Sequence, residues 1–241
     1  DRELRGQMSG GLCPFGVEDR ELADRLRTRD ASIRGIDGTL QFGALATDSI
    51  AAIETADIVG LRTAIIASLK TAQLAALTTN QLSNLTTGQV LAITTANMAQ
   101  LTSDQVVALS TDQASVLTSA QVVALSTDNI QALETDDIAV LKTSSIAGLS
   151  TKQAQALTTK QVVALGSGQI AALTSGQVIA MGSDSIVAIE TDDIGALKTN
   201  AFGAMTSAEV TALTTDQITA LKTSQIAALS TDQVMALTTQ Q

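Results

Sequence analysis

Residues 101–109, LTSDQVVAL, decide the fold, because the same eight-residue unit recurs along most of the chain. Every eighth residue from Leu45 to Leu237 is Leu, Ile or Met. The register is unbroken over 25 octads, residues 38–237, and this identifies a repeat array. The closest copies of the first stretch are LTSAQVVAL at 117–125, LTTKQVVAL at 157–165 and LTTDQITAL at 213–221.

Each octad is numbered so that its periodic apolar residue is position 8. Position 2 is then always Thr or Ser, and the following positions are polar before the apolar residues begin. This order is typical of a helix N-terminus, where a hydroxyl accepts from a backbone N–H two or three residues on. The sequence therefore predicts position 2 as the N-cap. The predicted structural N-caps include Thr47, Thr55, Thr79, Ser103, Thr111, Thr127, Thr135, Thr159, Thr191, Thr215 and Thr231.

Position 4 is Gln in 14 of the 25 octads. Where position 1 is Thr or Ser, the spacing Thr-x-x-Gln resembles a capping box. We expect these glutamines at solvated helix N-termini, the alternative being a polar ladder along one edge.

Positions 5 and 8 lie on one face of a helix, with Ala at position 7 beside them in most octads. The predicted fold is an all-α solenoid of 25 very short capped helices, one per octad. A β-solenoid is the alternative, but positions 5, 7 and 8 break the alternation of a strand and Ala is a poor strand former. The predicted core includes Ile50, Ile58, Leu77, Val106, Leu109, Leu125, Ile138, Leu165, Ile194, Leu213 and Leu237.

Residues 1–37 differ from the array, which occupies 38–241 as full octads plus a partial one. They hold seven of the 14 basic residues and the only proline. Terminal units of repeat arrays are often atypical caps, so we expect a cap, a docking segment or a linker here. Cys13 has no second cysteine with which to form an internal disulfide. Because the chain stops inside an octad, we expect it to be part of something longer.

The amino-acid composition limits the functions that we expect of the chain. The chain has no His, a formal net charge of −10 and no nucleotide-binding motif. Without His, no Ser-His-Asp arrangement is possible, and an acidic chain lacks the basic surface that nucleic-acid binding needs. No apolar run approaches the roughly 20 residues of a membrane helix. We therefore expect no enzyme, no cofactor, no metal site, no nucleic-acid partner and no membrane span.

Three related stretches begin at Asp48, Asp128 and Asp184. In each, a position-1 Glu is followed eight residues later by a position-1 base. If consecutive octads are neighbours in the stack, these residues form exposed inter-repeat ion pairs worth about 0–1 kcal/mol each. The predicted pairs are Glu54–Arg62, Glu134–Lys142 and Glu190–Lys198.

Residues 38–241 resemble octapeptide tracts of the LTTxQVxAL type in large bacterial secreted and surface proteins of the adhesin kind. The resemblance implies an extracellular or cell-surface location and a structural role as a stalk, spacer or self-assembling fibre. Its expected partners are other copies of itself and an unknown surface ligand. The alternative is a binding module that uses the repeated Thr/Ser/Gln edge for a glycan, a cation or ice.

Overall fold

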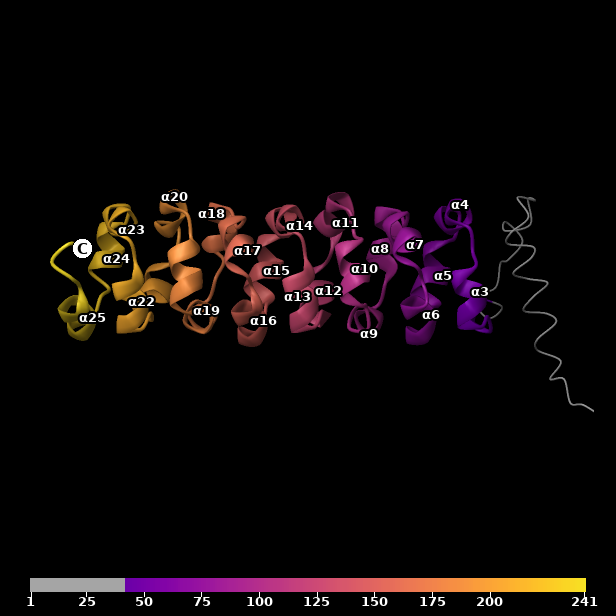
Figure 1. The fold of residues 1–241 in the computed structure, drawn as a ribbon, viewed down its shortest axis with the longest axis horizontal. Coiled ribbons are helices and arrows are strands. Elements are labelled where there is room, and N and C mark those ends of the chain that lie inside the picture. Colours follow the sequence, from indigo (N-terminus) through magenta and orange to yellow (C-terminus); the bar gives the residue numbers. More distant parts are fainter. Residues whose placement is uncertain (1–41) are drawn as a thin grey trace, which may run out of the picture.

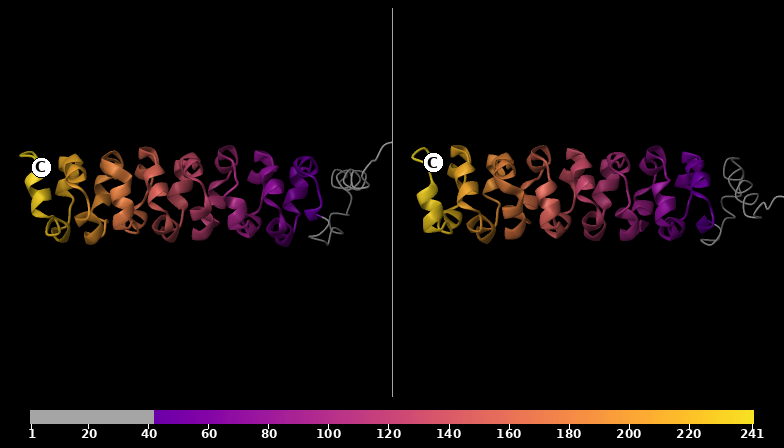
Figure 2. Two further views of the ribbon diagram at one scale, coloured as in Figure 1. Left: turned by 90° about the horizontal axis from the view of Figure 1, so that it is seen from below. Right: turned by 60° about the horizontal axis from the view of Figure 1, so that its bottom comes forward.

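The computed structural model describes residues 42–241, so the predictions for residues 1–37 and for Cys13 lie outside the described part. The described chain forms an elongated solenoid, with α3 and α25 at its opposite ends (Figures 1 and 2). All regular elements of residues 42–241 are short helices, and no strand occurs among them. The predicted α-solenoid is therefore confirmed, and the β alternative is wrong.

Each octad of residues 46–237 supplies one helix, with one exception. The helices of the first half are α3 (Thr47–Ala51), α4 (Thr55–Val59), α5 (Thr63–Ser68), α6 (Thr71–Ala75), α7 (Thr79–Ser83), α8 (Thr87–Ala92), α9 (Thr95–Met98), α10 (Ser103–Val107), α11 (Thr111–Val116), α12 (Ser119–Ala124), α13 (Thr127–Ala132) and α14 (Thr135–Val140). Those of the second half are α15 (Thr143–Gly148), α16 (Thr151–Ala156), α17 (Thr159–Val163), α18 (Ser167–Ile170), α19 (Ser175–Ala188), α20 (Thr191–Ile194), α21 (Thr199–Gly203), α22 (Ser207–Ala212), α23 (Thr215–Thr219), α24 (Thr223–Ile226) and α25 (Thr231–Ala236).

The exception is α19, which covers two octads. Its helical geometry is interrupted at Gly182, where φ is 74° and ψ is 173°. Side chains with a Cβ rarely adopt this backbone conformation, whereas glycine does so readily. Two short helices are thus joined at Gly182.

The bend between octads lies at positions 8 and 1. Leu125, for example, has φ −64° and ψ 146°, and the next residue, Ser126, has φ −68° and ψ 164°. These two extended residues turn the chain before the next helix begins. Isolated helices of four to six residues are unstable in water, so contacts between octads must stabilise them.

Helices three octads apart pack on one another, as α11 does on α14 and α12 on α15. Side-chain hydrogen bonds between turns join residues 25 to 31 positions apart. One turn of the superhelix therefore takes between three and four octads.

The core is one continuous column of position-5 and position-8 side chains along the solenoid. Ten of the predicted core residues are buried: Ile50, Ile58, Leu77, Val106, Leu109, Leu125, Ile138, Leu165, Ile194 and Leu213. Leu237 is only partly buried, because it lies in the last described turn. Burying a Val, Ile or Leu side chain contributes about 1.5–3 kcal/mol, so two such positions per octad provide most of the inter-turn cohesion.

The N-caps lie one residue earlier in the octad than the sequence predicts. Position 1 has extended backbone geometry and is the N-cap, whereas position 2 is the first helical residue. A side chain at position 1 can reach the N–H of position 4, and Thr78 Oγ1 accepts from the Gln81 N–H at 3.1 Å. The residues corrected in this way are Thr47, Thr55, Thr79, Ser103, Thr111, Thr127, Thr135, Thr159, Thr191, Thr215 and Thr231.

The premise of the predicted ion pairs is also wrong, because spatial neighbours are three to four octads apart rather than one. Lys142 Nζ donates to the carbonyl oxygen of Val116, 26 residues earlier, at 3.2 Å. Within the described residues, Glu134 and Lys142 form no ion pair, and neither do Glu190 and Lys198. The pair Glu54–Arg62 stays a prediction.

Candidate functional site

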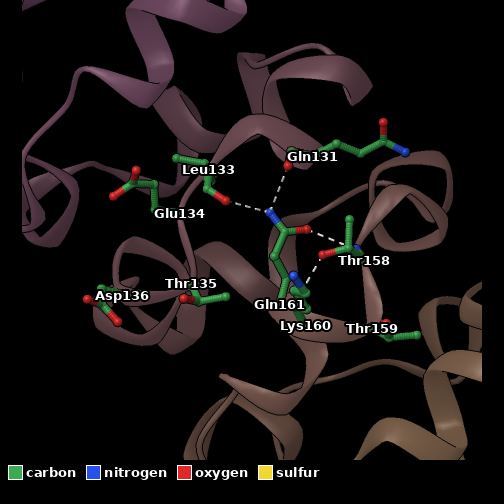
Figure 3. A pocket seen from close by; sticks show the side chains of 9 residues that line it. All are labelled: Gln131, Leu133, Glu134, Thr135, Asp136, Thr158, Thr159, Lys160 and Gln161. Carbon is green, nitrogen blue, oxygen red and sulfur yellow. Dashed lines mark hydrogen bonds between the residues drawn. The ribbon is translucent and has the colours of Figure 1, made fainter.

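The most regular chemical feature of the solenoid is its column of position-4 side chains. Gln161 shows the arrangement (Figure 3). Its Oε1 accepts from the Thr158 N–H at 2.9 Å, and the Thr158 hydroxyl accepts from the Gln161 N–H at 3.2 Å. This reciprocal pair is a capping box, as the spacing of the two residues predicts.

The amide nitrogen of Gln161 extends the arrangement to another turn. Nε2 donates to the carbonyl oxygen of Ile130 at 2.7 Å and to that of Leu133 at 2.8 Å. These acceptors lie 31 and 28 residues earlier, in the octad four before that of Gln161. One side chain thus caps its own helix and binds the end of the helix in the adjacent turn.

This link repeats along the rod, and we call it the position-4 ladder: the hydrogen bonds from position-4 amides to the carbonyl oxygen 28 residues earlier. Its donor–acceptor distances are 2.5 to 3.0 Å. The donors are Gln73, Gln81, Gln89, Gln105, Gln113, Gln121, Gln153, Gln161, Gln169, Gln177, Gln217, Gln225, Gln233 and Gln241, together with Asn97 and Asn129.

The expectation that these glutamines are solvated is wrong. Gln161 is 2% exposed and Gln217 is 1% exposed. A buried amide is costly unless its donors and acceptor are used. The amide nitrogen and the amide oxygen of Gln161 are both hydrogen-bonded, so the polar column is compatible with burial inside the solenoid.

The ladder has two gaps among the octads that follow Asn129. Position 4 is Asp137 and Ser145 in the first gap. In the second, Ser185, Asp193, Ala201 and Glu209 occupy it. None of these six side chains donates to the carbonyl 28 residues earlier, although all are buried. The second gap begins in the octad that opens with Gly182.

Two buried acids in the gaps accept hydrogen bonds instead of donating them. Glu209 Oε2 accepts from the Thr206 N–H at 2.6 Å, which preserves the capping box. Ser167 donates its hydroxyl proton to Asp193 Oδ1. Acidic side chains near a helix N-terminus also complement the helix dipole.

A shallow open groove of about 580 Å³ lies between the turns near Gln161 (Figure 3). Its rim carries the exposed charged residues Glu134, Asp136 and Lys160. The polar atoms of Gln161, at its base, are already hydrogen-bonded to the backbone. The groove thus offers an exposed charged rim over a base whose polar groups are occupied.

Residues 42–241 contain no cluster of three or more His, Cys, Asp or Glu that could hold a metal ion. In the same range, no helix has the length and apolar character required to cross a bilayer.

Comparison with known proteins supports the repeat architecture. The family model described as the ALTTAQ repeat matches residues 50–87, 90–127, 130–167, 156–183 and 186–223. Together these segments cover more than half of the chain. Four of the five segments begin at position 5 of an octad, which agrees with a continuous register. No curated protein matches the chain.

Proposed function

Because the chain belongs to the ALTTAQ repeat family, we propose that it is a structural repeat protein that acts as a stiff spacer. The supporting observation is the position-4 ladder. In a solenoid, each unit contacts only near neighbours, so length grows with the number of repeats. Buried hydrogen bonds between turns resist sliding and bending, because separating the turns leaves polar groups without partners.

The proposed setting is the surface of a bacterium, where the rod would hold another part of the protein away from the cell as an extracellular stalk. This setting rests on the resemblance to repeat tracts of large adhesin-like proteins. The proposed role is mechanical and involves no enzymatic activity. Its localisation would be tested with antibodies against the rod on intact and permeabilised cells, where equal labelling of both supports a surface location.

The spacer role predicts that length follows the octad count. We would delete residues 102–133, four whole octads, and measure the maximum dimension by small-angle X-ray scattering. The shortened protein should remain a folded rod with a smaller maximum dimension. The control deletes residues 102–129, which removes nearly the same mass but shifts the octad register by four residues. It should unfold or bend at the junction, and equal behaviour of the two deletions would contradict the proposal.

A second candidate is a self-assembling fibre. Position 6 faces outward, and its residues Leu91, Val107 and Val163 are 45%, 45% and 47% exposed. Exposed apolar side chains along a rod favour association with another copy. The two functions differ under dilution, because fibres dissociate with falling concentration, whereas a monomeric spacer keeps one sedimentation coefficient. Val107→Gln combined with Val163→Gln should weaken fibres without altering the helical circular dichroism spectrum.

A further inference from the structure

Asn129 and Asp137 occupy position 4 of consecutive octads and have side chains of equal length. Asn129 Nδ2 donates to the carbonyl oxygen of Leu101, 28 residues earlier, at 2.7 Å. Its Oδ1 accepts from the Ser103 hydroxyl, 26 residues earlier, at 3.2 Å. The two ends of this amide thus have distinct partners in the adjacent turns.

Asp137 has one of these partners and lacks the other. The Thr111 hydroxyl, also 26 residues earlier, hydrogen-bonds the Asp137 carboxyl group. The Oδ2 atom of Asp137 is buried and has no hydrogen-bond partner, and the residue is 1% exposed. Because the Asn129 amide nitrogen donates to the carbonyl oxygen 28 residues earlier, we expect Oδ2 of Asp137 to face the corresponding carbonyl oxygen, that of Leu109. Two oxygen acceptors then meet in a buried position, where an uncompensated charge is very costly.

The surrounding charges also disfavour a carboxylate here. Desolvation by burial is the main effect that raises the pKa of Asp137, and the Thr111 hydrogen bond opposes it. Glu134 and Asp136 raise this pKa further by repulsion. The helices packed on α14 are α11 and α17, whose titratable side chains are the exposed Asp112 and Lys160.

We propose that Asp137 is a proton-binding site of the solenoid: its protonated carboxyl group donates to the carbonyl oxygen of Leu109 and closes the position-4 ladder between octads 102–109 and 134–141. Loss of the proton breaks this link and leaves two acceptors facing each other. This inter-turn contact, in the first gap of the ladder, therefore responds to pH.

The sign of the pH dependence follows from the raised pKa. The unfolded chain releases the proton near pH 4, whereas the folded chain retains it to a higher pH. The wild-type protein should therefore lose stability as the pH rises from about 4 to the pKa of Asp137 in the folded state. At higher pH, the ionisation of Asp137 should cause no further loss. Between these two pKa values, each rise of one pH unit lowers the ratio of folded to unfolded protein about tenfold.

Asp137→Asn tests the proposal, because the amide provides a permanent donor as Asn129 does. Denaturant unfolding of both proteins between pH 3 and pH 8 should give similar stability at pH 3 and a more stable variant at pH 8. The control, Asp136→Asn, removes an exposed neighbouring charge and should retain most of the wild-type pH dependence. A pH-independent difference between wild type and Asp137→Asn would overturn the proposal.

Carboxyl ¹³C nuclear magnetic resonance of the wild-type protein provides a test that needs no stability comparison. The Asp137 signal is assigned by its loss in Asp137→Asn, and its midpoint should lie above the ordinary value for Asp, about 3.9. A midpoint at or below this value would overturn the proposal. Calcium chloride provides a further test: stabilisation of the wild type but not of Asp137→Asn would show that a cation, rather than a proton, occupies the site.

Discussion

The side-chain amide nitrogen of Gln121 lies 2.9 Å from the carbonyl oxygen of Ile93, which precedes it by 28 residues. The same nitrogen also donates to the carbonyl of Val90 at 2.9 Å, and Gln121 is 3% exposed. The apolar core gives the solenoid most of its cohesion, and these bonds fix which octads face each other. A shift of one residue would separate every donor of the ladder from its acceptor.

Replacing Gln121 with Glu should destabilise the protein strongly. The variant keeps the shape of the side chain and an acceptor for the capping box, but it removes both donors and buries a charge. Leaving buried polar groups unpaired costs about 1–3 kcal/mol each, and more for charged groups, so we expect a loss of about 2–4 kcal/mol. Denaturant unfolding at pH 7 measures this loss. Gln155→Glu, on the exposed side of α16, is the matched control and should change stability by less than about 0.5 kcal/mol.

The adjacent residues Thr158 and Thr159 separate the roles of positions 1 and 2. Thr158 is the N-cap of α17, and its hydroxyl accepts from the Gln161 N–H at 3.2 Å. Thr158→Ala should therefore cost about 1 kcal/mol, the usual value for an N-cap. Thr159 is exposed at the first helical position, so Thr159→Ala should cost much less. Thermal unfolding of the two variants gives the comparison, and an equal or reversed order would contradict the assignment of the cap.

Glu209→Gln should stabilise the protein by extending the ladder into its second gap. Glu209 is 3% exposed and already forms a capping box with Thr206. A glutamine would retain that cap, and its nitrogen would face the carbonyl of Met181, 28 residues earlier. We expect a gain of about 1 kcal/mol, typical of one hydrogen bond. Glu190→Gln removes the same charge from an exposed position 1 and should give no comparable gain in stability. If both variants gained equally, the cause would be the change in net charge and not a new hydrogen bond.

Gly182→Ala should destabilise the join inside α19. A Cβ at Gly182 would have no heavy atom within 4 Å, so the cost comes from the backbone conformation alone. Holding a residue with a Cβ at φ 74° and ψ 173° costs about 1–3 kcal/mol. Gly168→Ala is the control, because its Cβ would lie 3.5 Å from Thr143 Cγ2, an ordinary contact. That variant should be neutral or more stable, and a similar loss in both would exclude a conformational role for Gly182.

Much of this fold follows from the eight-residue period. A stretch such as LTSDQVVAL places Val106 and Leu109 on one helical face, and both are buried in the structure. The capping box of Thr102 and Gln105 also follows from their spacing. These features depend on residues close in sequence, so local propensity and amphipathic pattern are sufficient to predict them.

The position of the cap and the burial of the glutamines were harder to predict. Two consecutive hydroxyl residues, as in Thr158-Thr159, both fit an N-cap, and only the backbone geometry distinguishes them. The partners of Gln161 depend on how many octads complete one turn. The bend at positions 8 and 1 sets that number, and no sequence pattern specified it. The available signal was the predominance of Gln at position 4, which exceeds what an exposed capping side chain requires.

Disulfide formation between octads tests the geometry of the solenoid most directly. The hydroxyl oxygens of Ser119 and Ser144, which lie three octads apart along the chain, are 2.9 Å from each other. In a Cys13→Ser background, the pair Ser119→Cys and Ser144→Cys should form an intramolecular disulfide under mild oxidation. The pair Ser119→Cys and Thr127→Cys, one octad apart, should remain reduced. Closure of the second pair and not the first would show that consecutive octads are the neighbours, and would contradict a superhelix of three to four octads per turn.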